Sequence, residues 1–250
     1  MNYLGQHFLK NKDAITKIVA ALDLHEGETI VEIGPGKGVL TSELAKQPIK
    51  IIAIEKDHYL AKNLKIKRVE VIEGDILEIL PTLEIQNSKF KIVGNIPYYL
   101  TGFLFRIISE LENKPNLIVF MIQKEVAERI IAQPPKMNLL SASIQIWAEP
   151  EILITLPPKD FDPPPKVDST IIKFKVESLK FKINLESYYK LIKIVFKQPR
   201  KTLLNNLSEG FNISKEEIKK RIEKANLTGE ERGQDLSIEK IVSLLEVMHL

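Results

Sequence analysis

Short apolar runs alternate with amphipathic stretches between about residues 29 and 122. The apolar runs, whose length is typical of buried strands, are Thr29–Ile33, Lys50–Ile54, Val69–Ile72, Phe90–Val93 and Leu117–Ile122. The stretches between and after them whose apolar spacing predicts helices are Gly38–Lys46, His58–Lys65, Leu100–Leu111 and Lys124–Ile131. This alternation predicts an α/β fold of the Rossmann-like kind, a parallel sheet with helices on both faces.

The pattern changes in the second half of the chain. Three strand-like segments, expected to close the sheet with antiparallel strands, are Ala142–Ala148, Ile152–Leu156 and Ser169–Val176. After a junction at about 177–183 the periodicity is helical, and the expected helices are Tyr188–Phe196, Lys201–Leu207, Lys215–Ala225 and Ile238–Met248. Gly210 and Gly229 are expected between helices, and Ser214 and Ser237 as N-caps. We therefore expect two domains, an α/β domain over 1–178 and a small all-α domain over 179–250.

The amino-acid composition excludes several kinds of chemistry. The chain of 250 residues has no cysteine, which excludes disulfides and thiolate chemistry, and its four histidines form no ligand pair at helical spacing. We expect no metal site. No apolar run is long enough to span a bilayer and the N-terminus has no signal-peptide core, so a cytoplasmic protein with no membrane partner is expected. The net charge is +4 over residues 178–250 and −1 over the remainder, which suits a polyanionic partner, although an ordinary Lys-rich surface would look the same.

A glycine-rich turn follows the first apolar run. The segment Val31–Gly38 reads as a strand, a turn and the start of a helix, with glycines at 34, 36 and 38. A dinucleotide fingerprint has the spacing G-x-G-x-x-G, whereas this turn has G-x-G-x-G with Val39 at the last position. The spacing favours the related nucleoside-binding turn of S-adenosylmethionine (SAM) enzymes, although such a turn can also be purely structural.

Acidic residues follow the next two predicted strands. Glu55 ends the second strand about 20 residues after the turn, where a ribose diol is usually bound, and Asp75 follows the third strand. Asp75 can accept a hydrogen bond from an adenine amino group while Ile76 covers the ring. Either acid could instead be an ordinary surface or turn residue. Ligands of open parallel sheets bind at the carboxyl ends of strands, where all these residues are expected to meet.

The segment Asn95-Ile96-Pro97-Tyr98 follows the fourth predicted strand. The Asn95 side-chain oxygen and the Ile96 carbonyl can accept hydrogen bonds from an exocyclic amine, and the Tyr98 ring can stack on the base that carries it. Enzymes that methylate adenine N6 must hold the amine in this way, because its lone pair is delocalised into the ring. A capped turn is the alternative interpretation.

With these segments in this order, the chain closely resembles the ribosomal RNA adenine N6-dimethyltransferases, in particular the universal small-subunit (16S) RNA enzymes. Beyond the segments above, the resemblance is carried by Gly5–Leu9, by the Pro-rich segment Phe161–Ser169, by Phe196–Leu207 and by Asp235-Leu236-Ser237. His7 stands where the family more usually has Asn. The resemblance implies SAM as cofactor and an adenine target in small-subunit RNA, dimethylated at two adjacent positions near the 3′ end.

The resemblance also implies the site residues. Those expected to bind the cofactor are Gln6, His7, Leu9, Gly34, Gly36, Glu55, Lys56, Asp75, Ile76 and Asn95. Those expected to hold the target base are Asn95, Ile96, Pro97, Tyr98 and Phe161, the last presented by the stiff Pro-rich loop. Arg200 and Lys201 are expected to bind RNA, and the protein is expected to act as a monomer on the small ribosomal subunit. Two alternatives stay open: methylation of another substrate, such as large-subunit RNA in antibiotic resistance, and a non-catalytic assembly or transcription factor on the same fold.

Overall fold

The structure, a computed structural model, describes residues 7–85, 89–97, 100–176 and 181–248. The chain forms two compact units, one of Met1–Ala127 with Glu149–Val176 and one of Glu128–Ala148 with Glu177–Leu250. A single domain boundary near residue 178 was expected, and the grouping of Glu128–Ala148 with the C-terminal helices differs from it. No helix in the described parts of the chain has the length and apolar character needed to cross a membrane.

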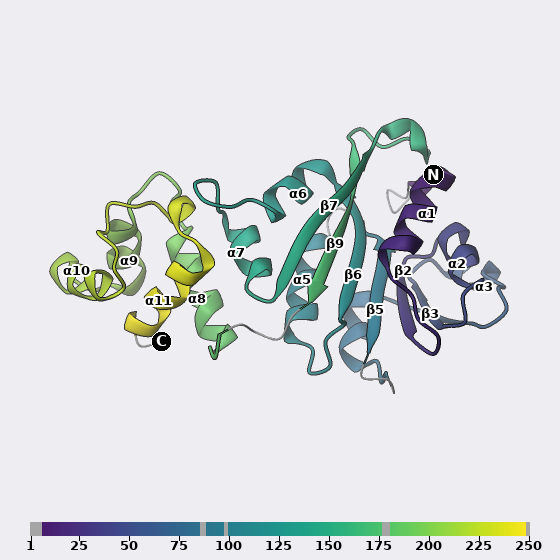
Figure 1. Cartoon of the computed structure of the whole chain (residues 1–250), viewed down its shortest axis with the longest axis horizontal. Helices are drawn as coiled ribbons and strands as arrows, with labels where there is room; N and C mark the ends of the chain where they lie inside the picture. The colour runs from purple at the N-terminus through teal and green to yellow at the C-terminus, as the bar shows by residue number, and fades with distance from the viewer. Residues whose placement is uncertain (1–6, 86–88, 98–99, 177–180, 249–250) are drawn as a thin grey trace. The chain divides into compact units, whose positions relative to one another are not determined.

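The first unit is built on a seven-stranded sheet (Figure 1). Its strands are β2 (Thr29–Ile33), β3 (Lys50–Glu55), β4 (Val69–Glu73), β5 (Phe90–Asn95), β6 (Leu117–Gln123), β7 (Ala148–Leu156) and β9 (Ser169–Val176). Its helices are α1 (Lys12–Ala21), α2 (Val39–Leu44), α3 (His58–Asn63), α4 (Ile76–Ile79), η1 (Leu80–Thr82), α5 (Thr101–Glu110) and η3 (Pro158–Asp160), while α6 (Lys124–Ile130) spans the boundary between the units. The α/β fold expected from the sequence is confirmed.

The strand order is β4-β3-β2-β5-β6-β9-β7. The strands from β4 to β6 pair in parallel, and β9 pairs antiparallel to β6. The order reverses between β2 and β5, whose ends meet in the register Ile33↔Gly94. Ligands of open α/β sheets bind at such a reversal, on the carboxyl side of the strands.

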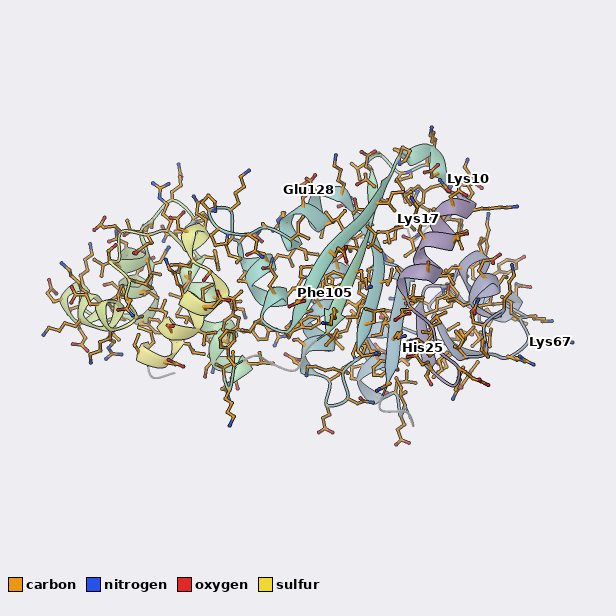
Figure 2. All side chains as sticks on the ribbon, viewed as in Figure 1. Lys10, Lys17, His25, Lys67, Phe105 and Glu128 are labelled. Carbon is orange, nitrogen blue, oxygen red and sulfur yellow. The ribbon has the colours of Figure 1, made fainter. Side chains whose placement is uncertain are left out.

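Apolar side chains on the middle strands explain the burial of the sheet. Every residue of β2 is buried, as are most of β5 and β6. On one side lies Phe105 of α5, labelled in Figure 2. Its ring packs against Phe120 of β6 and Phe174 of β9, with ring centroids 5.7 and 4.9 Å away. Tilted ring pairs of this kind add about 0.5–1.5 kcal/mol each beyond the burial of apolar area.

Helix α1 was not foreseen from the sequence. It begins after Asn11, whose side chain accepts a hydrogen bond from the backbone N–H of Ala14 at 3.1 Å. Ala14, Ile15 and Ile18 form its buried face, while Lys17 between them is exposed. The signals were therefore present, an N-cap residue followed by apolar positions at helical spacing.

The second unit is helical. Besides the end of α6 from Glu128 onward, its elements are α7 (Leu139–Gln145), α8 (Leu185–Val195), α9 (Leu203–Phe211), α10 (Lys215–Lys224), η4 (Gly233–Asp235) and α11 (Ile238–Met248). The expected caps are confirmed, because the Ser214 hydroxyl accepts from Glu217 N–H and the Ser237 hydroxyl from Lys240 N–H. The hydroxyl of Tyr188 in α8 donates to the carbonyl of Ala142 at 3.0 Å, which joins α7 to the C-terminal helices.

Two expectations about this unit were wrong. The strand expected at Ala142–Ala148 is largely helix α7, which a capping box between Asn138 and Ser141 starts; strand β7 begins only at Ala148. A short apolar run suits a buried helix as well as a strand, and here the cap decides. Gly210 lies inside α9 and not between helices. Glycine suits this position because a Cβ there would clash with Ile194 of α8.

Candidate functional site

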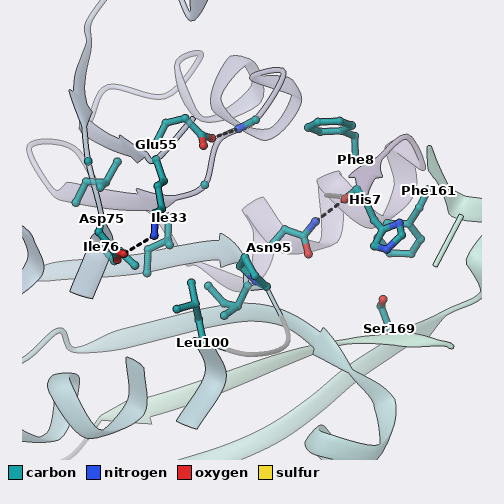
Figure 3. Close-up of a pocket in the computed structure, with 17 residues that line it drawn as sticks. His7, Phe8, Ile33, Glu55, Asp75, Ile76, Asn95, Leu100, Phe161 and Ser169 are labelled. Carbon is teal, nitrogen blue, oxygen red and sulfur yellow. Dashed lines mark hydrogen bonds and ion pairs between the residues drawn. The ribbon is translucent and has the colours of Figure 1, made fainter. Parts of the chain in front are cut away.

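A pocket of about 310 Å³ lies at the carboxyl ends of β2, β3 and β5 (Figure 3). Its walls are formed by His7, Phe8, Ile33, Gly34, Gly36, Ile54, Glu55, Lys56, Gly74, Asp75, Ile76, Asn95, Ile96, Pro97, Leu100, Phe161 and Ser169. Four groups of these residues lie at or just after the carboxyl ends of β2, β3, β4 and β5, which are parallel strands. The pocket therefore occupies the reversal of the strand order at which ligand binding is expected.

The glycine-rich turn forms one wall of the pocket. Gly34, Gly36 and Gly38 have φ angles of +63°, +57° and +75°, in the left-handed region that favours glycine. At Gly36 a Cβ would also lie 2.9 Å from the Phe8 ring. Glycine is therefore needed at this position both for the backbone conformation and for the close approach of the N-terminal segment.

Glu55 joins the end of β3 to this turn. Its carboxylate is buried and accepts hydrogen bonds from the backbone N–H groups of Gly36 at 3.0 Å and Asp57 at 2.9 Å. Each carboxylate oxygen has a second lone pair, so the group can also accept hydrogen bonds from two ligand hydroxyls. Its position at the pocket wall suits the ribose contact that the sequence predicts.

Lys56 and Asp75 form an ion pair next to Glu55, with the Lys56 Nζ 2.8 Å from the Asp75 Oδ2. The Asp75 Oδ1 accepts from the backbone N–H of Leu77 at 2.9 Å and so caps α4. The Lys56 ammonium and then this backbone N–H hold the pKa of Asp75 below its ordinary value. Asp75 is thus an ionised acceptor, and the buried Ile76 beside it supplies an apolar wall.

Asn95 and the turn after it form the opposite wall. The Ile96 N–H donates to the Met121 carbonyl at 3.0 Å, and the Leu100 N–H donates to the Pro97 carbonyl at 2.9 Å. The Asn95 side-chain Nδ2 donates to the backbone carbonyl of His7 at 2.7 Å (Figure 3). Hydrogen bonds therefore hold Ile96 against β6 and Asn95 against the N-terminal segment.

A two-stranded sheet, here called the β1–β8 clasp, forms beside the pocket. It pairs β1 (Phe8–Leu9) with β8 (Phe161–Asp162) in antiparallel register. The His7 Nδ1 lies 2.7 Å from the Pro163 carbonyl, and the Lys37 Nζ lies 4.6 Å from the centroid of the Phe8 ring. The clasp joins the N-terminal segment to the Pro-rich loop, more than 150 residues later in the chain.

Phe161 differs from the expected picture of a displayed ring. Its side chain is only 1% exposed and packs in the main core cluster, although part of it reaches the pocket wall. The pairing of β8 with β1 draws the start of the Pro-rich loop inward. Phe161 therefore offers the pocket a wall and not an exposed platform.

Glu32, in the middle of β2, is a buried acid beside the turn. Burial raises its pKa to about 7, and the charge of the Glu55 carboxylate adds to this rise. Its Oε2 and the Thr41 hydroxyl have no hydrogen-bond partner in the part of the chain described. Sequence reasoning quoted this residue within the strand but assigned it no role.

The structure brings most of the predicted site residues together. The predicted residues that line the pocket are His7, Gly34, Gly36, Glu55, Lys56, Asp75, Ile76, Asn95, Ile96, Pro97 and Phe161. Leu9 does not line it, but packs against the core and reaches a smaller adjoining pocket. Gln6 and Tyr98 lie outside the described residues. Six lining residues were not predicted as site residues, although each adjoins or falls within a segment singled out in the sequence: Phe8, Ile33, Ile54, Gly74, Leu100 and Ser169.

Arg200 and Lys201 belong to the other unit, in the turn before α9. The Lys201 Nζ lies 2.7 Å from the Glu209 Oε2, and the Lys197 Nζ lies 3.6 Å from the Glu209 Oε1. Arg200 is exposed, and the described residues give it no hydrogen bond or ion pair. The two cations expected to bind RNA are therefore not equally available.

The donor set fits SAM. The volume lies in the usual range for pockets that hold a ligand of this size, roughly 300–1,000 Å³. The glycine turn leaves backbone accessible, Glu55 accepts hydrogen bonds as a ribose diol requires, and Asp75 with Ile76 offers an acceptor and an apolar wall. Asn95 lies at the other side, where an acceptor amine would have to approach.

The chain matches the family described as ribosomal RNA adenine dimethylase over residues 2–249. It is 38% identical to "Ribosomal RNA small subunit methyltransferase A" of Dehalococcoides mccartyi, over 95% of this chain and 84% of that protein. It is 36% identical to the protein of the same description from Koribacter versatilis, over 96% of this chain and 92% of that protein.

Two solved structures share the fold. A dimethyladenosine transferase from Plasmodium falciparum superposes with a TM-score of 0.84 at 24% identity, covering 97% of this chain and 98% of that one. The 23S rRNA methyltransferase ErmE superposes with a TM-score of 0.76, also at 24% identity, covering 97% of this chain and 100% of that one. At 24% identity these two similarities show that the fold is shared and nothing more.

Proposed function

Because the chain belongs to the ribosomal RNA adenine dimethylase family, we propose that it transfers methyl groups from SAM to the N6 atoms of adenines in small-subunit (16S) ribosomal RNA. The product is N6,N6-dimethyladenine at two adjacent adenines near the 3′ end of that RNA. The observation that supports this best is the placement of Asn95 in one pocket with Glu55 and Asp75. Asn95 provides a hydrogen-bond acceptor for the substrate amine, opposite the groups that suit a nucleoside.

The cofactor contacts are assigned along the strand ends. When bound, SAM supplies an electrophilic methyl group on its sulfonium. Glu55 accepts hydrogen bonds from the ribose hydroxyls, and Asp75 accepts one from the adenine amine while Ile76 covers the ring. The Gly34–Gly36 turn leaves room for the methionine part next to His7 and Phe8. Gln6 is assigned to the same end from the family resemblance.

The acceptor contacts are assigned to the Asn95 turn. The target adenine leaves its stack in the RNA and enters the pocket. In the first transfer the Asn95 Oδ1 and the Ile96 carbonyl accept hydrogen bonds from the two N6–H groups, which holds the amine for in-line attack on the methyl group. One N6 proton is released to solvent after each transfer, so a single N6–H remains to be held in the second. Tyr98, from the family resemblance, stacks on the base, and Phe161 supplies the wall behind it. Positioning and electrostatics then provide the acceleration.

The RNA is proposed to dock on the C-terminal helical unit through Arg200 and Lys201. The net charge of +4 over residues 178–250 supports this, because a polyanion is drawn to the unit with the cationic excess. We also propose that the protein works as a monomer on the small ribosomal subunit in the cytoplasm. These placements extend the family assignment and are separate from the chemistry of the pocket.

Methyl incorporation tests the substrate. Purified protein with methyl-labelled SAM should label small subunits that lack these dimethyladenines, and digestion of the RNA should yield N6,N6-dimethyladenosine. Large subunits and fully methylated small subunits are the controls. Labelling of large subunits only would favour the antibiotic-resistance type of activity, and no labelling of either, with SAM binding intact, would favour an assembly factor without catalysis.

A further inference from the structure

The orientation of the Asn95 side chain follows from its partner. The Asn95 Nδ2 lies 2.7 Å from the backbone oxygen of His7, an atom that can only accept a hydrogen bond. The NH₂ side of the amide must therefore face His7. Figure 3 shows the side-chain oxygen of Asn95 turned away from His7, and no hydrogen bond reaches this oxygen from the described residues. An acceptor is thus left free on the pocket side.

The His7 carbonyl is itself held in place from several directions. The His7 Nδ1 donates to the Pro163 carbonyl at 2.7 Å. The next residues pair in the β1–β8 clasp, in the register Phe8↔Asp162, and the Lys10 N–H donates to the Asp160 carbonyl at 2.9 Å. The position of one backbone oxygen near the N-terminus is therefore set by the Pro-rich loop.

We propose that the His7 carbonyl is a positioning group for methyl transfer, which locks the Asn95 amide so that its oxygen faces the acceptor amine. The His7 side chain keeps the carbonyl in place through Pro163. This inference rests on the proposed transfer to an adenine amine, and it adds a role for the N-terminal segment in the acceptor half of the site.

The chemical reason is the asymmetry of the amide. An amide rotated by 180° presents its NH₂ group to the pocket, and two donors then face each other when an amine enters. A carbonyl 2.7 Å from the side chain favours one of the two orientations, because only the NH₂ side can donate to it. The N-terminal segment therefore acts on the transfer step through Asn95, beyond any contact it makes with the cofactor.

His7→Ala and His7→Asn separate this role from cofactor binding. Alanine removes the bond to Pro163, while asparagine can donate from nearly the position of the imidazole Nδ1. We expect His7→Ala to lower single-turnover methyl transfer about tenfold or more even at SAM concentrations that saturate this variant by its own measured Kd. His7→Asn should restore at least half of the parent rate. Thr16→Ala, an exposed hydroxyl that bonds only within α1, is the control and should match the parent.

A second measurement needs no turnover. The Asn95 side-chain NH₂ resonances, assigned by their loss in Asn95→Asp, should show slow solvent exchange in the parent and faster exchange in His7→Ala. Parent-level transfer with unchanged Asn95 resonances in His7→Ala would overturn the inference. So would a loss of activity that saturating SAM fully restores, because the segment would then serve the cofactor alone. Methylation of small subunits by the parent protein tests the proposed function separately.

Discussion

The Glu55 carboxylate accepts a hydrogen bond from the backbone N–H of Gly36 at 3.0 Å. One buried side chain thereby connects the end of β3 to the glycine-rich turn after β2, 19 residues earlier. The residue that is proposed to bind the ribose is also a structural part of the wall around the methionine end of the cofactor. Changes at Glu55 should therefore affect both binding and the shape of the turn.

Glu55→Ala should weaken SAM binding and also destabilise the first unit. The change leaves the backbone N–H groups of Gly36 and Asp57 without their acceptor, at a cost of about 1–3 kcal/mol for each buried donor left unpaired. Glu55→Gln keeps one acceptor oxygen and should lose less of both. Calorimetry with SAM and thermal unfolding of the two variants measure this. Parent-like affinity and stability in Glu55→Ala would contradict the assignment.

Asn95→Ala should abolish methyl transfer while the affinity for SAM stays within about tenfold, or ~1.4 kcal/mol. The Asn95 oxygen is proposed to act on the acceptor amine in the transition state, so its loss falls on the rate. Labelled-SAM incorporation into small subunits and calorimetry of SAM binding are the two measurements. Near-normal turnover by the folded variant would remove Asn95 from the mechanism.

Lys56→Met should reduce the part of the free energy of unfolding that depends on ionisation of Asp75. The lowered pKa of Asp75 means that its interactions stabilise the fold above the ordinary pKa of 3.8 and that this contribution is lost as the pH falls further. Because Lys56 is 55% exposed, the loss at pH 7 should stay below about 1 kcal/mol, and it should vanish under acid conditions. Urea unfolding between pH 7 and pH 3 tests this, with the exposed Lys65→Met as control. An equal effect of both variants would argue against the pair.

Glu32 should make the protein less stable as the pH rises from about 4.5 to about 7. Its pKa is raised from 4.5 to about 7 in the folded state, so the folded protein binds the proton more tightly than the unfolded chain. This contribution is fully present below pH 4.5 and is lost by about pH 7; at 1.36 kcal/mol per pH unit it amounts to about 3 kcal/mol. Glu32→Gln, which stays neutral, should flatten this part of the profile. Denaturant unfolding of both proteins between pH 4.5 and pH 7 measures how the free energy of unfolding depends on pH. The same dependence in Glu32→Gln as in the parent would contradict the prediction.

Glu209→Gln should strengthen binding to the RNA substrate. The change releases Lys201 and Lys197 from their ion pairs with Glu209, so both cations become available for phosphate contacts. Glu186→Gln makes the same change in net charge at an exposed pair elsewhere in this unit and serves as the matched control. Affinity for small subunits, measured over a range of salt, should rise and depend more steeply on salt for Glu209→Gln only. Equal effects of both variants would indicate general charge and not a docking site at Arg200 and Lys201.

The sequence by itself determined where the parallel strands lie along the chain and which residues stand at their carboxyl ends. Buried strands alternating with amphipathic helices form a parallel sheet, and a parallel sheet collects its carboxyl ends at one edge. Gly34, Glu55, Asp75 and Asn95 could therefore be placed around one pocket before any contact was known. Capping signals at Ser214 and Ser237 were equally local and equally readable.

The tertiary structure decided whatever depends on partners distant in the chain. The helix at Leu139–Gln145 was misread as strand, because a short apolar run carries no decisive period and its burial against neighbouring elements is not encoded locally. The burial of Phe161 and the bond from Asn95 to His7 both follow from the pairing of β1 with β8. Hydrogen bonds between segments 88 or more residues apart depend on how the whole chain closes, and sequence patterns report only what is near.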